Sequence, residues 1–171
     1  MKYSILIFLA LLFSTASQAE NWYVGGGAGL INSDDGEDII EPTNLYFRIG
    51  YQFNQNFNIG LESSVTVVPD QIPNAPDVDL SVDTVTFYIR GGAPITDSIF
   101  VYAQFGQTNT EITAELNGFE FSVDDDDSMI GIGAEIDLTS KSNYLAINWS
   151  RYNSSDGVDI TGFNIGLGGR F

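Results

Sequence analysis

The sequence contains no cysteine and no histidine, and only 6 of its 171 residues are Lys or Arg. Without cysteine there is no disulfide framework and no thiolate metal site. Without histidine there is no imidazole base, which excludes both Ser-His-Asp and Cys-His catalysis. The few basic residues do not cluster, so we expect no nucleic-acid partner, because binding to a phosphate backbone needs a positive patch.

Acidic and hydrophobic residues dominate what is present. The chain has 23 Asp and Glu residues, a formal net charge of -17 and 43% hydrophobic residues. This content is too apolar for a disordered chain, in spite of the charge. The length fits one domain.

The first nineteen residues have the layout of a secretory signal peptide. A charged start at Lys2 precedes the apolar run Ile5–Phe13, and small residues follow up to Ala19. The run is too short to span a bilayer as a helix. We therefore predict a signal peptide over 1–19, with one β-barrel domain over 20–171. A buried N-terminal helix is the alternative.

After residue 20 the chain alternates between apolar and polar residues, and no segment shows sustained helical periodicity. In one run, Leu45, Phe47 and Ile49 share a face, and Tyr46 and Arg48 share the other. Each run has about ten residues, which suits a tilted strand that crosses a bilayer. The pattern predicts eight strands, at 21–31, 44–54, 57–67, 84–95, 99–110, 128–138, 143–152 and 161–171.

The connections between these strands alternate between short and long. The short ones are near 54–56, 96–98 and 139–142, and the long ones are 32–43, 68–83, 111–127 and 153–160. Tight turns at one end and larger loops at the other are typical of outer-membrane barrels. We therefore predict an all-β fold, an eight-stranded antiparallel up-and-down transmembrane β-barrel in the cell outer membrane, with its long loops outside the cell.

The first hairpin allows a check of the register. If it is centred on Gln55, then Tyr51 faces Ile59 and Arg48 faces Glu62. Apolar cross-strand pairs and a pair of opposite charges then arise together, as stable sheet pairing requires.

Alternation alone does not say which face points inward. A soluble lipocalin-like barrel would enclose the apolar face around a hydrophobic ligand, whereas a membrane barrel would turn it to lipid. Side chains just fill an eight-stranded barrel, and rows of Phe, Ile and Leu would overfill it. We therefore predict that the apolar face is outside and that paired charges pack the interior, in preference to a gated ion path. These charges are Arg48, Glu62, Arg90, Glu135, Asp137 and Arg170.

Three segments resemble strands of a known family. Trp22–Leu30, Phe100–Gly106 and Gly162–Phe171 are similar to the opening, central and closing strands of the small outer-membrane β-barrel family that includes the OmpA transmembrane domain, OmpX and OmpW. The resemblance covers 20–171 in layout. It implies that the closing strand carries the signal read by the barrel assembly machinery, at Phe163, Ile165, Leu167 and Phe171.

The long predicted loops hold 18 of the 23 acidic residues and no Lys or Arg. The simpler interpretation is a solvated surface. The sharper one is Ca²⁺ binding, because this ion prefers carboxylate oxygens, and it could bridge the loops to lipopolysaccharide phosphates. The candidate ligands are Asp124, Asp125, Asp126 and Asp127, although this run lacks the spacing of an EF-hand loop. We expect no other cofactor.

Two further features lie near the predicted outer end. Asn117-Gly118 predicts a hairpin tip, which would extend two strands beyond the membrane and expose a sheet edge for pairing with another chain. Arg151 falls on the lipid face, where it could reach a lipid phosphate or the acidic loops.

Four classes of function follow from these observations. The first is a monomeric structural or surface-interaction protein that contacts outer-membrane lipid and lipopolysaccharide. The alternative is a narrow porin-like channel for ions or small solutes. An enzyme is not expected, because outer-membrane deacylases, palmitoyltransferases and proteases rely on a histidine. A soluble ligand binder is the fourth.

Overall fold

The computed structural model describes residues 21–34, 39–72, 75–138, 142–153 and 159–171, and its elements are all strands. The predicted signal peptide lies outside the described residues, as do Asp35, Glu37, Asp38 and Asp156. In chain order the strands are β1 (Trp22–Asp34), β2 (Ile39–Ile40), β3 (Thr43–Asn54), β4 (Phe57–Val68), β5 (Asp70–Ile72), β6 (Ala75–Pro94), β7 (Ile99–Leu116), β8 (Phe119–Asp137), β9 (Asn143–Asn153) and β10 (Asp159–Arg170).

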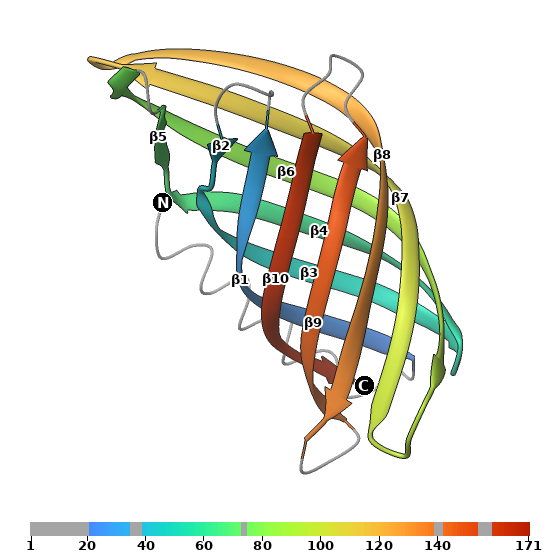
Figure 1. Ribbon diagram of the computed structural model, residues 1–171. Coiled ribbons are helices and arrows are strands. Elements are labelled where there is room, and N and C mark those ends of the chain that lie inside the picture. The colour runs from blue at the N-terminus through green and yellow to red at the C-terminus, as the bar shows by residue number, and fades with distance from the viewer. Residues whose placement is uncertain (1–20, 35–38, 73–74, 139–141, 154–158) are drawn as a thin grey trace.

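The eight long strands form a closed antiparallel barrel (Figure 1). Each long strand pairs with the next along the chain, and β10 pairs with β1 from Tyr23↔Arg170 to Asp34↔Asp159. Closure satisfies the backbone groups of both outermost strands, as a membrane barrel requires. The prediction of eight strands is confirmed, with β2 and β5 as short additions. Within the described ranges, no helix has the length and apolar character needed to cross a membrane.

The β3–β4 hairpin has the predicted register. Tyr51 pairs with Ile59 and Arg48 pairs with Glu62, while the register shifts by one residue next to the turn, between Gln52 and Asn54. A slip of one residue along the whole hairpin would move every apolar side chain to the opposite face, so this register fixes which residues enter the barrel.

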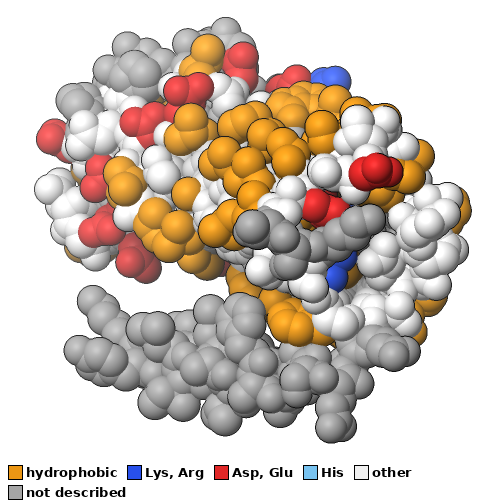
Figure 2. Space-filling model, turned by 90° about the horizontal axis from the view of Figure 1, so that it is seen from below, with side chains coloured by type: hydrophobic (Ala, Val, Ile, Leu, Met, Phe, Trp, Pro, Cys, Tyr) orange, Lys and Arg blue, Asp and Glu red, His pale blue; other side chains and the backbone are white. Residues whose placement is uncertain are grey.

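Large apolar side chains point outward from the barrel wall. Leu61, Ile89, Ile132 and Leu167 each expose about half of their surface or more, whereas the positions between them turn inward and are mostly buried. Figure 2 shows the resulting hydrophobic surface beside an end rich in acidic side chains. The predicted orientation of the two faces is confirmed, and the lipocalin-like alternative, with its apolar face inside, is wrong.

Three strands are longer than predicted. β6 begins at Ala75, β7 continues to Leu116 and β8 begins at Phe119, so these strands pass beyond the others at the end opposite the C-terminus (Figure 1). The predicted loop 68–83 is therefore mostly strand, and that part of the prediction is wrong, whereas 111–127 forms the two extended strands that the predicted hairpin tip implied. The alternation continues in both segments, but acidic residues replace apolar ones on the outward face, which made 68–83 resemble a loop.

The predicted hairpin tip is confirmed at Asn117 and Gly118. Both have positive φ angles, 51° and 82°, and the flanking residues Leu116 and Phe119 pair directly. Two consecutive residues with positive φ define the type I′ turn, which matches the twist of the strands that it joins.

Candidate functional site

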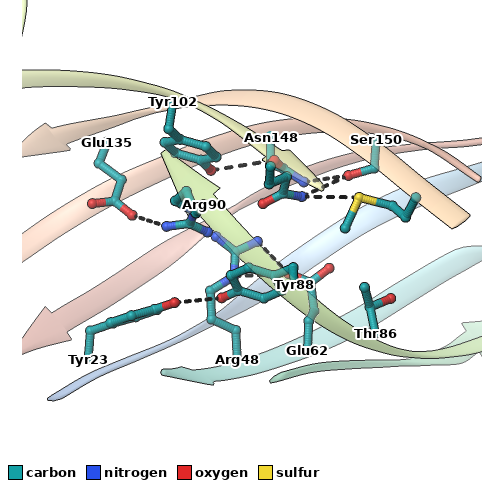
Figure 3. A network of polar contacts seen from close by, with 12 residues as sticks. Tyr23, Arg48, Glu62, Thr86, Tyr88, Arg90, Tyr102, Glu135, Asn148 and Ser150 are labelled. Carbon is teal, nitrogen blue, oxygen red and sulfur yellow. Dashed lines mark hydrogen bonds and ion pairs between the residues drawn. The ribbon is translucent and has the colours of Figure 1, made fainter. Parts of the chain in front are cut away.

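The barrel interior contains the predicted charges, and the first of their ion pairs joins β3 to β4 (Figure 3). Arg48 donates to Glu62, with its Nε atom 2.9 Å from Oε2. The two side chains expose only 1% and 5% of their surface. Such a pair compensates two charges that would each be costly to bury alone.

A second group of ion pairs joins three more strands. Glu135 on β8 accepts a hydrogen bond from Arg90 on β6 at 2.6 Å and another from Arg170 on β10 at 2.6 Å. Arg170 also donates to Asp137 at 2.7 Å. All six residues predicted to be interior charges thus lie inside the barrel and contact each other in two groups.

Tyrosine rings enclose the two most deeply buried guanidinium groups. The central carbon of Arg90 lies 3.9 Å from the ring centre of Tyr102 and 5.2 Å from that of Tyr88. The corresponding carbon of Arg48 lies 5.2 Å from the ring centre of Tyr46. Each desolvated cation–π contact contributes about 2 kcal/mol. The ring faces therefore replace part of the hydration that the arginines lose.

Hydroxyl groups extend the network between distant strands. The hydroxyl of Tyr23 donates to Asn58 Oδ1 at 3.0 Å and lies 2.9 Å from the hydroxyl of Tyr88. The sequence analysis did not assign a role to these tyrosines. A signal was present, because Tyr46 and Tyr88 alternate with the apolar residues of their strands and so share the polar face with Arg48 and Arg90.

Glycines on the inward face make room for these rings. A β-carbon at Gly133 would lie 2.5 Å from the ring of Tyr102, and one at Gly60 would lie 2.5 Å from the hydroxyl of Tyr88. Both distances are too short for any side chain larger than hydrogen. Pairing a glycine with a neighbouring tyrosine thus fills the barrel without overfilling it.

A small cavity lies between several of these side chains. A cavity bordered by Tyr23, Arg90, Glu135 and Arg170 has a volume of about 20 Å³, enough for about one water molecule. Toward the outer end, a buried apolar cluster packs across the barrel, formed by Ile31, Ile40, Val82, Tyr88, Met129, Tyr152 and Ile160. The sequence analysis did not predict this cluster.

The outer parts of β6, β7 and β8, from Val78 to Asp83, Glu111 to Leu116 and Phe119 to Asp124, form what we call the outer sheet. On its outward face, carboxylates oppose each other across all three strands. The pairing places Asp79, Glu115 and Glu120 in one row and Asp83, Glu111 and Asp124 in another, with Ser81, Thr113 and Ser122 between them. The rows are four residues apart, or about 13 Å.

The inward face of the outer sheet is apolar. Val82, Ile112 and Val123 stand in one row, and Val78, Leu116 and Phe119 in another. Val82 is fully buried in the apolar cluster, whereas Phe119 and Phe121 expose 81% and 80% of their surface. The polarity of the two faces is therefore reversed relative to the barrel wall, where the apolar face points outward.

The four aspartates proposed to bind Ca²⁺ lie on β8. Consecutive side chains of a strand point to opposite faces, so Asp124 and Asp126 are separated from Asp125 and Asp127 by the sheet. Among the described residues, no three His, Cys, Asp or Glu side chains gather where they could hold a metal ion. The geometry gives no support to a single site there, and Ca²⁺ binding stays a prediction.

Two outward-facing groups lie as the sequence analysis expected. Arg151 forms a double hydrogen bond with Asp159 of the predicted fourth loop, with both distances 2.9 Å. The residues of the proposed assembly signal point outward on β10 or just after it, and each exposes between 37% and 60% of its surface: Phe163, Ile165, Leu167 and Phe171.

The sequence matches the model of one protein family over residues 4–171, described as the outer membrane protein beta-barrel domain. None of the curated proteins matches it. The fold is similar to that of Neisserial surface protein A, with a TM-score of 0.72, 11% identity, and coverage of 88% of this chain and 97% of that one.

Two further solved structures share the fold. Ail of Yersinia pestis, in complex with the heparin analogue sucrose octasulfate, has a TM-score of 0.67 and 13% identity, and the match covers 90% of this chain and all of Ail. The N-terminal β-barrel domain of Pseudomonas aeruginosa OprF has a TM-score of 0.63 and 14% identity, with coverage of 90% and 100%. At these identities the likeness concerns the fold alone.

Proposed function

The chain belongs to the outer membrane protein β-barrel family and resides in the cell outer membrane, and from this premise we propose that it is a surface-interaction protein whose outer sheet binds positively charged partners. It carries out no catalysis. The barrel anchors the outer sheet at the surface of the cell.

The two carboxylate rows of the outer sheet are the observation that carries this proposal. Like charges directly opposite each other weaken strand pairing, and here each row contains three. Asp83 and Asp79 also accept hydrogen bonds, from the Thr66 backbone and the Gln71 side chain, but no such gain is evident for the four carboxylates on β7 and β8. A local arrangement that costs stability in this way is characteristic of functional surfaces. A cationic partner would relieve the repulsion, so part of its binding energy comes from the strain of the free state.

The sign of this charge sets the chain apart from one of its structural neighbours. Ail has been crystallised with a heparin analogue, sucrose octasulfate, which is a polyanion. The carboxylate rows would repel such a ligand. We therefore propose a similar scaffold with partners of the opposite charge.

The alternative of a porin-like channel has less support. The interior cavity of about 20 Å³ and the apolar cluster at the outer end both argue against a path for hydrated ions. We further propose that the barrel is a monomer, that it contacts lipopolysaccharide, and that the assembly machinery reads its closing strand, whose apolar side chains face outward.

The test measures binding of a fluorescent poly-lysine probe to the protein in nanodiscs of zwitterionic lipid. We expect binding that weakens as salt rises from 0.05 to 0.5 M, values chosen to shorten the Debye length from well above 10 Å to well below it. Exchanging Glu111, Glu115 and Glu120 for glutamine and Asp124 for asparagine should weaken binding by on the order of tenfold.

The matched control is Asp97→Asn, which neutralises an exposed carboxylate at the end with the short turns. It should bind the probe as the unaltered protein does. The proposal is wrong if the fourfold variant binds with unchanged affinity, or if binding does not respond to salt.

A further inference from the structure

The outer sheet ends at the outer part of β8. β9 pairs with β8 only from Ser128 toward the C-terminus, which leaves the part of β8 nearer the hairpin tip beyond its reach. We call the segment Phe119–Asp124 the outer edge. On its side away from β7, no strand of the described part of the chain pairs with it. At the other side of the outer sheet, β5 covers β6.

The hairpin geometry determines which backbone groups the outer edge presents. In a two-residue hairpin, the residues that flank the turn, here Leu116 and Phe119, exchange both hydrogen bonds, and the ladder then alternates. The backbone groups of Glu120, Ser122 and Asp124 therefore point away from β7. They offer donors and acceptors at the spacing of a β-strand.

The side chains along the outer edge alternate strictly. Phe119, Phe121 and Val123 lie on the apolar face and expose 81%, 80% and 64% of their surface. Glu120 and Asp124 lie on the other face, where each is the last member of a carboxylate row, and Ser122 ends the row between them. Exposed apolar edges favour pairing with other strands, and proteins usually protect them.

We propose that the outer edge binds an extended polypeptide segment by β-strand addition, in which the segment carries basic residues four apart and apolar residues between them. An antiparallel strand placed there would set a basic residue opposite Asp124 and another opposite Glu120. A small polar residue would face Ser122, and three apolar residues would face Val123, Phe121 and Phe119. The matching sequence pattern is basic, apolar, polar, apolar, basic, apolar. This inference rests on the proposed function, for which it supplies a partner class and a binding mode.

Charge determines which partner fits. A second copy of this chain would place Glu120 and Asp124 near further carboxylates and extend the repulsion. A basic strand would instead complete each carboxylate row with a cation. Backbone hydrogen bonds then supply affinity, and the alternating side chains supply specificity.

The test uses the peptide Lys-Val-Thr-Val-Lys-Val with blocked ends and a fluorescent label, titrated against the protein in nanodiscs. The variant Ser122→Pro removes a backbone N–H on the open side while leaving the bonds to β7 in place. We expect it to weaken binding by about tenfold, the loss of one to two hydrogen bonds. The control Ser122→Ala keeps the N–H and should bind normally.

The scrambled peptide Lys-Lys-Val-Val-Thr-Val should bind about tenfold more weakly than the patterned one, because its side chains cannot match both faces of the outer edge.

A second measurement does not depend on how proline is tolerated. The chain lacks cysteine, so a peptide with cysteine in place of its threonine should form a disulfide with Ser122→Cys, since opposed strand residues lie within disulfide range. Both reactions are run with dissolved oxygen and a copper–phenanthroline catalyst, which accept the two electrons that each disulfide releases. No disulfide should form with Thr113→Cys, whose side chain is on the same face but lies one strand further from the open edge.

The outcomes separate this inference from the proposed function. Equal binding of both peptides, an unchanged affinity of Ser122→Pro, or equal crosslinking at both cysteines would overturn strand addition. If the poly-lysine probe still binds in a salt-dependent way, the proposed function survives that result. If poly-lysine fails to bind as well, both proposals are wrong.

Discussion

Replacing Glu135 with alanine should lower the free energy of unfolding by about 5 kcal/mol, the upper end of the range for breaking a buried ion pair. Glu135 accepts hydrogen bonds from both Arg90 and Arg170, and the Arg90 side chain exposes only 1% of its surface. Its removal leaves two guanidinium groups without their shared carboxylate. Asp137 pairs with Arg170 and, among the described residues, forms no ion pair with Arg90, so it does not compensate the charge of Arg90.

Urea unfolding in lipid vesicles measures this loss. Two further variants show which interactions account for the loss of unfolding free energy. Glu62→Ala strands a single buried guanidinium, Arg48, and should cost about 3 kcal/mol. Glu135→Gln keeps the shape and one acceptor and should cost less than alanine. An unchanged unfolding midpoint for Glu135→Ala would show that these charges do not stabilise the barrel.

Replacing Tyr88 with alanine should cost about 4 kcal/mol, as truncation of a buried aromatic does. Tyr88 is fully buried and belongs to the apolar cluster. Its ring also lies 5.2 Å from the guanidinium carbon of Arg90. This single substitution therefore opens a cavity where the charged part of the barrel interior meets the apolar cluster.

The variant Tyr88→Phe separates packing from hydrogen bonding. It removes only the hydroxyl, which lies 2.9 Å from that of Tyr23, and should cost about 1 kcal/mol. If alanine and phenylalanine reduce the midpoint by the same amount in vesicle unfolding, then the ring itself contributes nothing and the described packing is wrong.

Period-two alternation was enough to predict most of the barrel. It located eight strands, because the outward and inward faces meet solvents of opposite polarity along the whole wall. It also predicted the register of β3 with β4, since only one alignment pairs Tyr51 with Ile59 and Arg48 with Glu62.

The part of β6 that belongs to the outer sheet was missed because the outward face of the sheet changes there from apolar to acidic. Beyond the membrane the outward face meets water, so acidic residues such as Asp79 and Glu115 occupy it, while Leu80 and Ile112 turn inward. The high local acidity of 68–83 was interpreted as loop. In 111–127, by contrast, the Asn117-Gly118 tip did predict the two extended strands.

The tyrosines of the interior were missed for a different reason. Tyr23 on β1 and Tyr88 on β6 lie beside guanidinium groups from strands that are not their neighbours, those of Arg90 and Arg48. The alternation indicates that these rings face inward, but closure of the barrel determines which arginine each ring contacts. The local sequence does not contain that information.

The proposed function requires that the outer sheet is displayed on the cell surface. Because the chain has no cysteine, the labelling of a single introduced cysteine shows on which side of the outer membrane that residue lies, without labelling of other residues. Ser122→Cys places a thiol on the outer edge, and Ser98→Cys places one in the short turn between β6 and β7.

Intact cells expressing each variant are treated with a maleimide coupled to a polymer too large to cross the outer membrane. We expect labelling of Ser122→Cys in intact cells, and of Ser98→Cys only after the membrane is broken. The reverse pattern would place the carboxylate rows in the periplasm and contradict the proposed role in surface interaction.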